Sequence, residues 1–256
     1  MTMPEPIIRV DQLTIGYDER VVLSDLNFQV HRGEVFVILG GSGSGKSTLL
    51  KHMIGLYPPM RGRIWLDGID IVTAQGETRL SALQRIGVTY QSGALFGSMT
   101  LAENVRLPLE EYTDLPDDAL DLIARMKLDL VGLQEFADSL PSEVSGGMQK
   151  RAGIARAMAL DPAVLFLDEP SAGLDPVTSA ELDQLILRLQ RSLGVTFVVV
   201  THELPSIFTI ADRVIMIDRL ARGIVAEGPP KELRDHSRNP TVHAFFNRQP
   251  GTVVTA

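Results

Sequence analysis

A glycine-rich segment between residues 40 and 47 carries residue types that bind phosphate. It reads Gly40-Gly41-Ser42-Gly43-Ser44-Gly45-Lys46-Ser47 and fits the pattern G-x-x-x-x-G-K-[ST]. Glycines let backbone N–H groups approach phosphate oxygens because no Cβ atom intervenes, and a helix that follows points its positive end at the anion. Lys46 would reach the β- and γ-phosphates, Ser47 would bind Mg²⁺, and Thr48 would contact the α-phosphate.

The neighbours of this segment distinguish a phosphate-binding loop from a flexible Gly/Ser turn. A continuously apolar run, 35–39, precedes it and is typical of a buried parallel strand. A helical pattern over 46–56 follows it. The motif requires this order of strand, glycine loop and helix, so the sequence predicts a site for a nucleoside triphosphate with Mg²⁺.

Two adjacent carboxylates supply the second half of a phosphoryl-transfer site. Asp168 and Glu169 end another apolar run, 164–167, which predicts a buried strand. Asp168 would hold Mg²⁺ through its water shell, and Glu169 would polarise a water for in-line attack on the γ-phosphate. Taken alone, a strand that ends in Asp-Glu is more often a turn or a helix cap. Together with a phosphate loop, it indicates catalysis.

An α/β fold is needed to position these residues. Strand-like runs dominate the first part of the chain, at 7–10, 13–17, 26–30, 35–39 and 63–66. Strand signals disappear between residues 100 and 160, where a helical insert is expected. Strands then alternate with helices, with strands at 164–167, 195–201 and 213–217 and helices at 177–191 and 204–211. A short helix over 231–235 and a segment at 243–247 follow.

The composition limits the possible functions. The 256 residues have a net charge of −8 and are 45% hydrophobic, which is typical of a globular chain and argues against sequence-independent binding of nucleic acid. The absence of cysteine excludes disulfides and thiolate chemistry. No secretory signal is recognisable, and no apolar run approaches the roughly 18 residues that cross a bilayer. We therefore expect a cytoplasmic protein whose membrane role depends on a partner.

Further motifs make the chain resemble the ABC-type ATPases over nearly its whole length. Val144-Ser145-Gly146-Gly147-Met148-Gln149 is similar to the signature segment of that family and precedes a helix rich in Arg and Ala. Gln91 follows the strand-like run 86–90 and matches the loop glutamine near Mg²⁺ and the lytic water. His202 follows the run 198–201 and matches the switch histidine that contacts the γ-phosphate. Taken alone, such a histidine is more often a polar strand end.

The resemblance implies further roles. Tyr17 lies where the family places an aromatic ring under adenine, and the segment 171–175, which includes Asp175, resembles the loop that joins two active sites. Ser145, Gly146 and Gly147 begin a helix whose end, in this family, caps the γ-phosphate held by the other subunit. ATP would therefore join two copies of the chain. By itself, Ser-Gly-Gly is equally an ordinary N-cap with a hinge.

The signature departs from the common pattern at two positions. Met148 stands where the family usually has glutamine, and Val144 where it usually has leucine. The usual glutamine contacts the nucleotide only peripherally, so activity is expected to survive. The residues that the resemblance assigns to hydrolysis are all present, namely Lys46, Gln91, Asp168, Glu169 and His202.

A finer resemblance concerns the ATPase subunits of Mce/Mla-type lipid transport systems, whose signatures also use methionine. It is carried by the segments 91–96, 103–109 and 140–148. It implies integral-membrane permease subunits, a periplasmic Mce-type lipid-binding partner and a lipid cargo. Leu95, Phe96 and Met99 would line the groove for the permease's coupling helix, unless they pack in the core of the helical insert. Phe245 and Phe246 would anchor a contact between a C-terminal extension and the neighbouring ATPase, unless the terminus is frayed.

These observations predict an α/β protein with a P-loop (RecA-like) ABC ATPase core, an N-terminal antiparallel β subdomain and an inserted α-helical subdomain. Residues 1–247 would form one ATPase domain, with 1–91 and 161–230 as core and β subdomain and 92–160 as the helical subdomain; 231–256 would be a C-terminal extension. The expected protein is a homodimeric, Mg²⁺-dependent ATP hydrolase of a lipid transporter, peripheral to the cytoplasmic face of the inner membrane.

Three alternatives remain open at this point. One is the ATPase of an importer of polar small molecules such as amino acids. Another is an ABC ATPase of DNA repair or translation, although the chain has neither a long heptad insertion nor two fused ATPase units. The third is a non-catalytic nucleotide-binding regulatory module.

Overall fold

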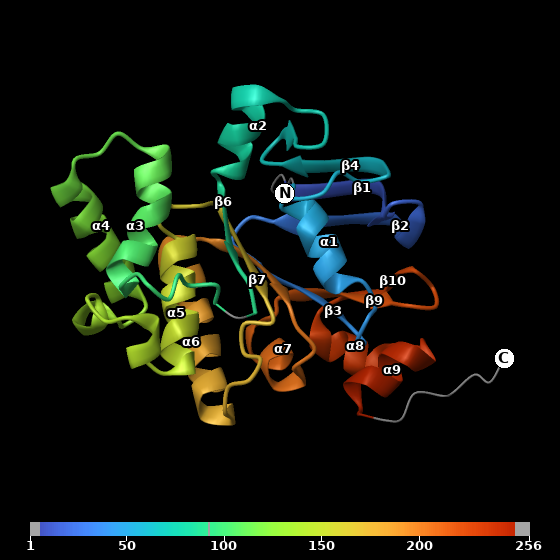
Figure 1. The fold of residues 1–256 in the computed structure, drawn as a ribbon. Coiled ribbons are helices and arrows are strands. Elements are labelled where there is room, and N and C mark those ends of the chain that lie inside the picture. The colour runs from blue at the N-terminus through green and yellow to red at the C-terminus, as the bar shows by residue number, and fades with distance from the viewer. Residues whose placement is uncertain (1–5, 92, 249–256) are drawn as a thin grey trace.

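The computed structural model describes residues 6–91 and 93–248, and a six-stranded sheet forms its centre (Figure 1). The strand order is β10-β9-β3-β8-β7-β6. The parallel strands are β3 (Val35–Gly40), β6 (Ile86–Thr89), β7 (Val164–Asp168), β8 (Thr196–Val200) and β9 (Arg213–Asp218). An antiparallel strand that was not predicted, β10 (Gly223–Gly228), forms one edge. Every residue of β3 and β8 is buried, which confirms that their apolar runs are central strands.

A smaller antiparallel sheet, in the order β2-β1-β4-β5, confirms the predicted N-terminal β subdomain. Its strands are β1 (Pro6–Tyr17), β2 (Arg20–His31), β4 (Arg61–Leu66) and β5 (Ile69–Asp70). The prediction of two separate strands at 7–10 and 13–17 is wrong, because both belong to β1. A bulge between Val10 and Leu13, where Gln12 has a φ of 47°, interrupts the alternation without ending the strand.

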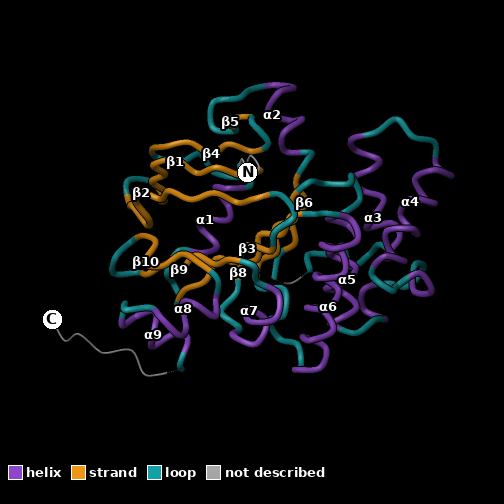
Figure 2. Tube along the Cα trace, turned by 180° about the vertical axis from the view of Figure 1, so that it is seen from behind, coloured by secondary structure: helices purple, strands orange, loops and turns teal. Residues whose placement is uncertain are grey.

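Both faces of the six-stranded sheet are covered. Helix α1 (Lys46–Met53) and the smaller sheet pack on the face that carries Phe36, Ile38 and Phe166. The helices α5 (Gly146–Ala157), α6 (Pro176–Leu193) and α7 (Leu204–Ile210) cover the opposite face. Figure 2, the view from behind, shows α1 between the two sheets. The helices α3 to α6 lie together on the right of this view. Because both faces are dry, the sheet holds its carboxyl-terminal edge in a fixed position.

The inserted helical subdomain is confirmed. It contains α3 (Leu101–Tyr112), α4 (Asp117–Leu130), α5 and two short 3₁₀ turns, Gln134–Phe136 and Pro141–Glu143. The first helix begins at Leu101, after a capping box formed by Thr100 and Glu103. The turn before it is held by the buried amide of Asn104, which accepts from Phe96 N at 2.8 Å and donates to Phe96 O at 3.1 Å. A further helix, α2 (Gly76–Leu83), was not predicted.

The C-terminal helices belong to the packed domain. They are α8 (Pro230–His236) and α9 (Pro240–Phe246). Phe246 is 4% exposed and its ring lies 5.8 Å from that of Phe208 in α7. The hypothesis that Phe246 anchors a contact with a neighbouring subunit is therefore wrong, because its ring is buried within its own chain. Phe245 is half-buried, and residues 249–256 of the expected tail lie outside the described residues.

No helix in the described ranges combines the length and the apolarity needed to cross a membrane.

Phe246→Ala should lower the free energy of unfolding by about 3 kcal/mol, because truncating a buried phenylalanine loses its transfer free energy and leaves a cavity. Equilibrium unfolding in urea would measure the change. Phe245→Ala, at the adjacent half-buried position, is the matched control and should cost less than half as much. Equal costs for the two variants would contradict the burial of Phe246.

Candidate nucleotide-binding and hydrolysis site

The predicted phosphate-binding loop connects the central strand β3 to α1. Gly43 and Gly45 have φ angles of 70° and 101°, which side chains rarely adopt, and a Cβ atom at Gly45 would lie 3.0 Å from Val22. Lys46 is the first residue of α1, and Leu49 N donates to Gly45 O at 2.8 Å. The loop therefore directs backbone N–H groups and a helix N-terminus toward one place, as anion binding requires.

Lys46 is buried inside this loop. Its Nζ donates to Gly40 O at 2.9 Å and to Gly41 O at 3.1 Å. An ammonium group has three donors, so one remains for a ligand. Burial lowers the pKa of Lys46, and the charges of Glu169 and Asp168 oppose that shift. The Ser44 hydroxyl is also buried and has no hydrogen-bond partner among the described residues, so it can bond to a polar ligand in the loop.

Asp168 and Ser47 come together as predicted. Asp168 ends β7, and Ser47 Oγ donates to Asp168 Oδ1 at 3.4 Å. Burial raises the pKa of Asp168, as does the charge of Glu169, while Ser47 and Lys46 act in the opposite direction. Hydroxyl and carboxylate oxygens are the ligands that Mg²⁺ prefers in proteins, so the donor set fits that ion.

Glu169 and His202 form a direct contact that the sequence did not predict. His202 Nδ1–H donates to Glu169 Oε1 at 2.7 Å. Glu169 has a φ of 47°, and its backbone N–H donates to Val200 O at 2.8 Å, which ties it to β8. Glu169 at the end of β7 and His202 after β8 thus meet between neighbouring strands. The other carboxylate oxygen, Oε2, is buried without a partner in the described part of the chain. Such an oxygen is available to a water or ligand proton.

Gln91 follows β6 at the same sheet edge and is exposed. Its carbonyl accepts a hydrogen bond from Lys150 Nζ, which lies on α5. Burial lowers the pKa of Lys150, and the charge of Glu169 opposes that shift. Lys150 was missed by the sequence analysis because its proximity to Gln91 depends on how α5 packs.

Tyr17 lies beside the phosphate-binding loop. Its hydroxyl is 3.4 Å from Thr48 Oγ1, and its ring makes an edge contact with Tyr57 at 5.7 Å. The buried His52 supports this cluster, since its Nδ1–H donates to Thr48 O at 2.8 Å. The sequence analysis missed His52 and Tyr57. The spacing of Thr48 and His52, one helical turn apart, was the available signal.

A hollow of 550 Å³ adjoins the loop at Tyr17. Its other lining residues include Val22, Gly43 and Ser44 and three arginines that were not predicted, Arg20, Arg219 and Arg222. The hollow extends the phosphate-binding loop on the side of Tyr17. It is therefore large enough and suitably placed for the nucleoside part of a nucleotide.

The signature segment is placed differently from the other motifs. Ser145 is the N-cap of α5 and accepts from Met148 N at 3.2 Å, while Ser145 and Gly146 are exposed. A Cβ atom at Gly147 would lie 2.4 Å from Thr178 Cγ2, so glycine permits α5 to pack against α6. In the described residues, no hydrogen bond or ion pair joins this segment to the loop at 40–48. Among the described residues, the signature segment is thus not bonded to the phosphate loop of its own chain.

Asp175 is an N-cap in this structure. Its Oδ1 accepts from Val177 N at 3.0 Å and from Thr178 N at 3.1 Å, at the start of α6. Hydrogen bonds from Thr178 hold its pKa below the usual range. The segment 171–175 is thereby fixed to the end of a long helix.

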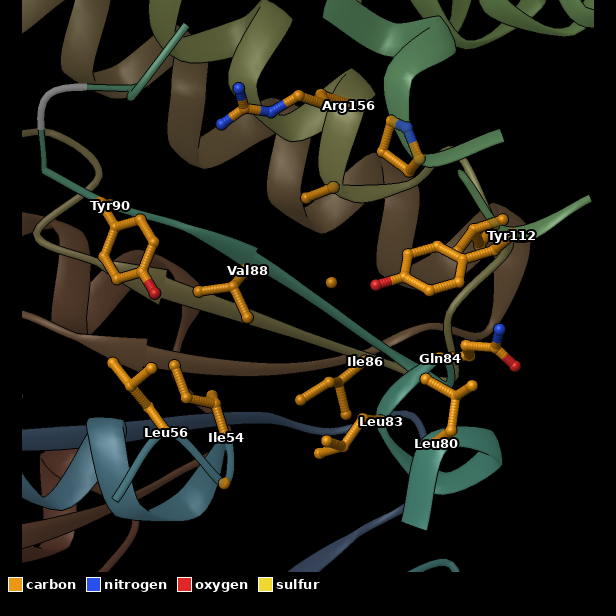
Figure 3. A pocket seen from close by; sticks show the side chains of 15 residues that line it. Ile54, Leu56, Leu80, Leu83, Gln84, Ile86, Val88, Tyr90, Tyr112 and Arg156 are labelled. Carbon is orange, nitrogen blue, oxygen red and sulfur yellow. The ribbon is translucent and has the colours of Figure 1, made fainter. Parts of the chain in front are cut away.

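A second hollow, of 440 Å³, lies between the central sheet and the helical subdomain (Figure 3). Its lining is mostly apolar and includes Ile54, Leu56, Leu80, Leu83, Ile86, Val88 and Tyr112. Arg156 also lines it and donates to Ala94 O at 2.7 Å, so the hollow adjoins the segment after Gln91. The predicted groove residues do not line this hollow. Leu95 packs against the core, Met99 is half-buried, and Phe96 is 56% exposed.

Four neighbouring strands thus deliver the predicted residues to one edge. The phosphate loop follows β3, Asp168 and Glu169 end β7, His202 follows β8, and Gln91 follows β6. An anion-binding loop, an oxygen donor set for Mg²⁺ and a carboxylate with a free oxygen can together bind a nucleoside triphosphate and direct water at its terminal phosphate. This arrangement defines the class of P-loop nucleoside triphosphatases.

Comparison with known proteins identifies the family. The family described as ABC transporter matches residues 23–172, so the chain belongs to the ABC transporter family. The intermembrane phospholipid transport system ATP-binding protein MlaF of Haemophilus influenzae is 40% identical over 231 residues, which cover 90% of this chain and 87% of MlaF. The probable ribonucleotide transport ATP-binding protein mkl of Mycobacterium leprae is 41% identical over 240 residues, covering 94% of this chain and 68% of mkl.

A solved structure agrees with the fold. The dimeric post-hydrolysis state of the ATP-binding cassette MJ0796, bound to ADP and Pi, matches with a TM-score of 0.77 and 30% identity, covering 87% of this chain and 98% of that one. The predicted ABC ATPase fold is therefore confirmed. The chain is an ATP hydrolase and the ATPase subunit of a transporter.

Proposed function

We propose that this chain drives lipid transport across the cell envelope, as the ATPase subunit of an Mce/Mla-type phospholipid transporter. The observation that carries the proposal is the 40% identity to a phospholipid-transport ATP-binding protein over 90% of the chain. An importer of polar small molecules remains the alternative, and the similar mkl is described as a probable ribonucleotide transport protein. The expected domain division belongs to the same proposal, with 92–160 as helical subdomain and 231–256 as C-terminal extension.

In the proposed site, the 40–48 loop binds the phosphates of ATP and Tyr17 stacks under adenine. Ser47 and Asp168, with water near Gln91, would hold Mg²⁺, which neutralises charge on the β- and γ-phosphates. The 3.4 Å contact between Ser47 and Asp168 supports this assignment. Lys46, which is itself buried in the loop, supplies its remaining N–H donor to the γ-phosphate.

Glu169 is the proposed base or water-orienting group. A water bonded to its free Oε2 attacks the γ-phosphorus in line, the bond to the β-phosphate oxygen breaks, and ADP and inorganic phosphate result. The His202 ring donates a hydrogen bond to Glu169 in this structure. The γ-phosphate of bound ATP would be an alternative acceptor for that hydrogen bond. Moving that donor to the phosphate would stabilise the developing charge there and leave both carboxylate oxygens to the water.

Two copies of the chain are proposed to enclose the nucleotides. The exposed Ser145 and Gly146 begin α5, and a helix N-terminus with free N–H groups attracts anions. Since this segment does not bond to its own phosphate loop, it is available to the γ-phosphate bound by a second copy. Asp175 and its loop would join the two sites. The dimeric state of the similar MJ0796 cassette supports this arrangement.

The permease is proposed to dock in the 440 Å³ hollow beside β6. Its apolar lining suits a short helix from a membrane subunit, and Arg156 links it to the segment after Gln91. Docking there would place the chain at the cytoplasmic face of the inner membrane. A periplasmic Mce-type protein would complete the pathway on the other side.

Glu169→Gln should reduce phosphate release by a factor of about 100 or more while ATP binding persists, because the amide cannot accept the proton of the attacking water. The dimer formed with ATP should live longer, since its phosphate is not removed. Phosphate release and size-exclusion chromatography with ATP measure both effects. Glu203→Gln, which removes an exposed carboxylate 3.7 Å from His202 Nε2, is the matched control. Unimpaired release in Glu169→Gln would overturn the assignment of Glu169.

Leu80→Asp should weaken association with the permease by about tenfold or more, because it places a charge among the apolar residues of the hollow. The side chain is 45% exposed, so the fold should tolerate the change. Co-purification from detergent-solubilised membranes is the measurement. Leu122→Asp, at a position on α4 that is 61% exposed and does not line the hollow, is the control. Equal recovery of the permease with both variants would place the docking surface elsewhere.

The transported class is tested on the intact complex. Purified with its membrane partners, the complex should carry phospholipid that mass spectrometry detects after extraction, at more than the background of a detergent-matched membrane protein. Activity that instead depends on a periplasmic binding protein for a polar solute would favour the importer.

A further inference from the structure

Three aromatic rings meet beside the phosphate-binding loop, and one of them belongs to a buried histidine. Tyr17 ends β1, His52 lies in the last turn of α1, and Tyr57 follows that helix. The ring centroids lie 6.5 Å apart for Tyr17 and His52, 5.7 Å for Tyr17 and Tyr57, and 5.9 Å for His52 and Tyr57. These separations fall within the roughly 4.5–7 Å of aromatic contacts, so each ring contacts the other two.

The three rings differ in burial. His52 is 1% exposed, whereas Tyr17 and Tyr57 are 41% and 40% exposed. The histidine is thus the inner member of the cluster, and the two tyrosines present part of their surface to solvent. An exposed ring can stack on a planar ligand, while a buried ring can only hold its neighbours in place.

The orientation of the His52 ring is fixed within its own helix. Its Nδ1–H donates to Thr48 O at 2.8 Å, one turn earlier in α1. A carbonyl oxygen only accepts hydrogen bonds, so the ring proton lies on Nδ1. Burial lowers the pKa of His52, and the bond to Thr48 opposes that shift, so the ring is mainly neutral at neutral pH.

A histidine in this place costs stability that an apolar residue would not. Nε2 of His52 is buried and has no hydrogen-bond partner among the described residues, and a buried acceptor without a partner is unfavourable. Leucine or phenylalanine would fill comparable space without that cost. What the histidine adds is the bond to Thr48, which locks its ring relative to the phosphate-binding loop.

Thr48 also contacts Tyr17. The Tyr17 hydroxyl lies 3.4 Å from Thr48 Oγ1. The same threonine was predicted to contact the α-phosphate, so it belongs to the nucleotide site. The Tyr17 side chain is therefore held by Thr48 at its hydroxyl and by His52 at its ring.

The end of α1 places Tyr57. Gly55 has a φ of 73°, and its N–H donates to His52 O at 3.0 Å. Leu56 N donates to Lys51 O, also at 3.0 Å. This pair of bonds is the Schellman arrangement, which fixes the direction of the chain after a helix. Tyr57 follows directly and is thereby held against the other two rings.

We propose that His52 is a positioning residue for nucleotide binding, which holds the ring of Tyr17 in the orientation that stacks on adenine, with Tyr57 as a second support. The inference rests on the role proposed above for Tyr17. Ordering a partly exposed side chain on binding costs affinity, and a ring that its neighbours already hold avoids that cost. His52 therefore acts on the binding of the base and not on that of the phosphates.

Binding to the full-length chain separates these two parts of the nucleotide. His52→Ala should weaken binding of ADP with Mg²⁺ about fivefold, because the ligand must then order Tyr17 itself. Binding of inorganic tripolyphosphate, which has no base, should stay within about twofold of wild type. Isothermal titration calorimetry measures both affinities. In ATP hydrolysis, KM should rise about fivefold while kcat stays within about twofold.

A double-mutant cycle tests whether His52 acts through Tyr17. In the Tyr17→Ala background, His52→Ala should change the affinity for ADP by less than about twofold, since the ring that it positions is gone.

Tyr57→Ala is an arm that does not depend on the stability of His52→Ala, because the side chain is 40% exposed. It should weaken ADP binding about two- to threefold. Phe136→Ala, which truncates an aromatic residue of the helical subdomain with the same 40% exposure, is the matched control and should bind ADP as wild type does.

The proposal is overturned if His52→Ala binds ADP within about twofold of wild type, or if it weakens tripolyphosphate binding as much as ADP binding. The second result would mean that the histidine merely supports the phosphate-binding loop. A full effect of His52→Ala in the Tyr17→Ala background would also overturn it. Failure of the proposed adenine contact would be seen separately, as an unchanged ADP affinity in Tyr17→Ala alone.

Discussion

The structure is organised around the need to surround a polyphosphate with backbone N–H groups at the end of a buried strand. These groups converge only because Gly43 and Gly45 adopt positive φ angles and because β3 is held between β8 and β9. A strand in that position must be dry on both faces, which explains why one sheet and α1 cover one side and the helices α5 to α7 cover the other. The neighbouring parallel strands then deliver their own carboxyl-terminal residues to the same edge.

Burial gives this edge its electrostatic character. Lys46 loses solvation and its pKa falls, while burial raises the pKa of Asp168, so each group stands in an unfavourable environment that a charged ligand would relieve. One carboxylate oxygen of Glu169 accepts a hydrogen bond from His202, and the other has no hydrogen-bond partner among the described residues. In the proposed site, phosphate oxygens and a divalent cation would interact with these buried groups and so offset the free-energy cost of burying them.

The same helices that support the site also connect it to distant surfaces. Helix α5 starts at the signature residue Ser145 and carries Lys150, bonded to Gln91 O, and Arg156, which lines the apolar hollow. Helix α6 starts directly after the segment 171–175, helix α7 starts two residues after His202, and the two helices pack against each other. In the proposed mechanism, a change at the γ-phosphate would reach the helical subdomain and a second subunit through these packed helices.

The sequence by itself determined the phosphate-binding loop, the acidic strand end, the buried strands and the inserted helices. Each depends on residues close together in the chain, where glycine, charge and hydrophobic period act locally. Only the tertiary structure decided that β1 continues through a bulge, that Phe246 packs in its own chain and that Leu95, Phe96 and Met99 lie outside the apolar hollow. It alone brought Glu169 to His202 and Lys150 to Gln91. These contacts join residues from different elements, and their pairing depends on how helices and strands pack, which no local pattern records.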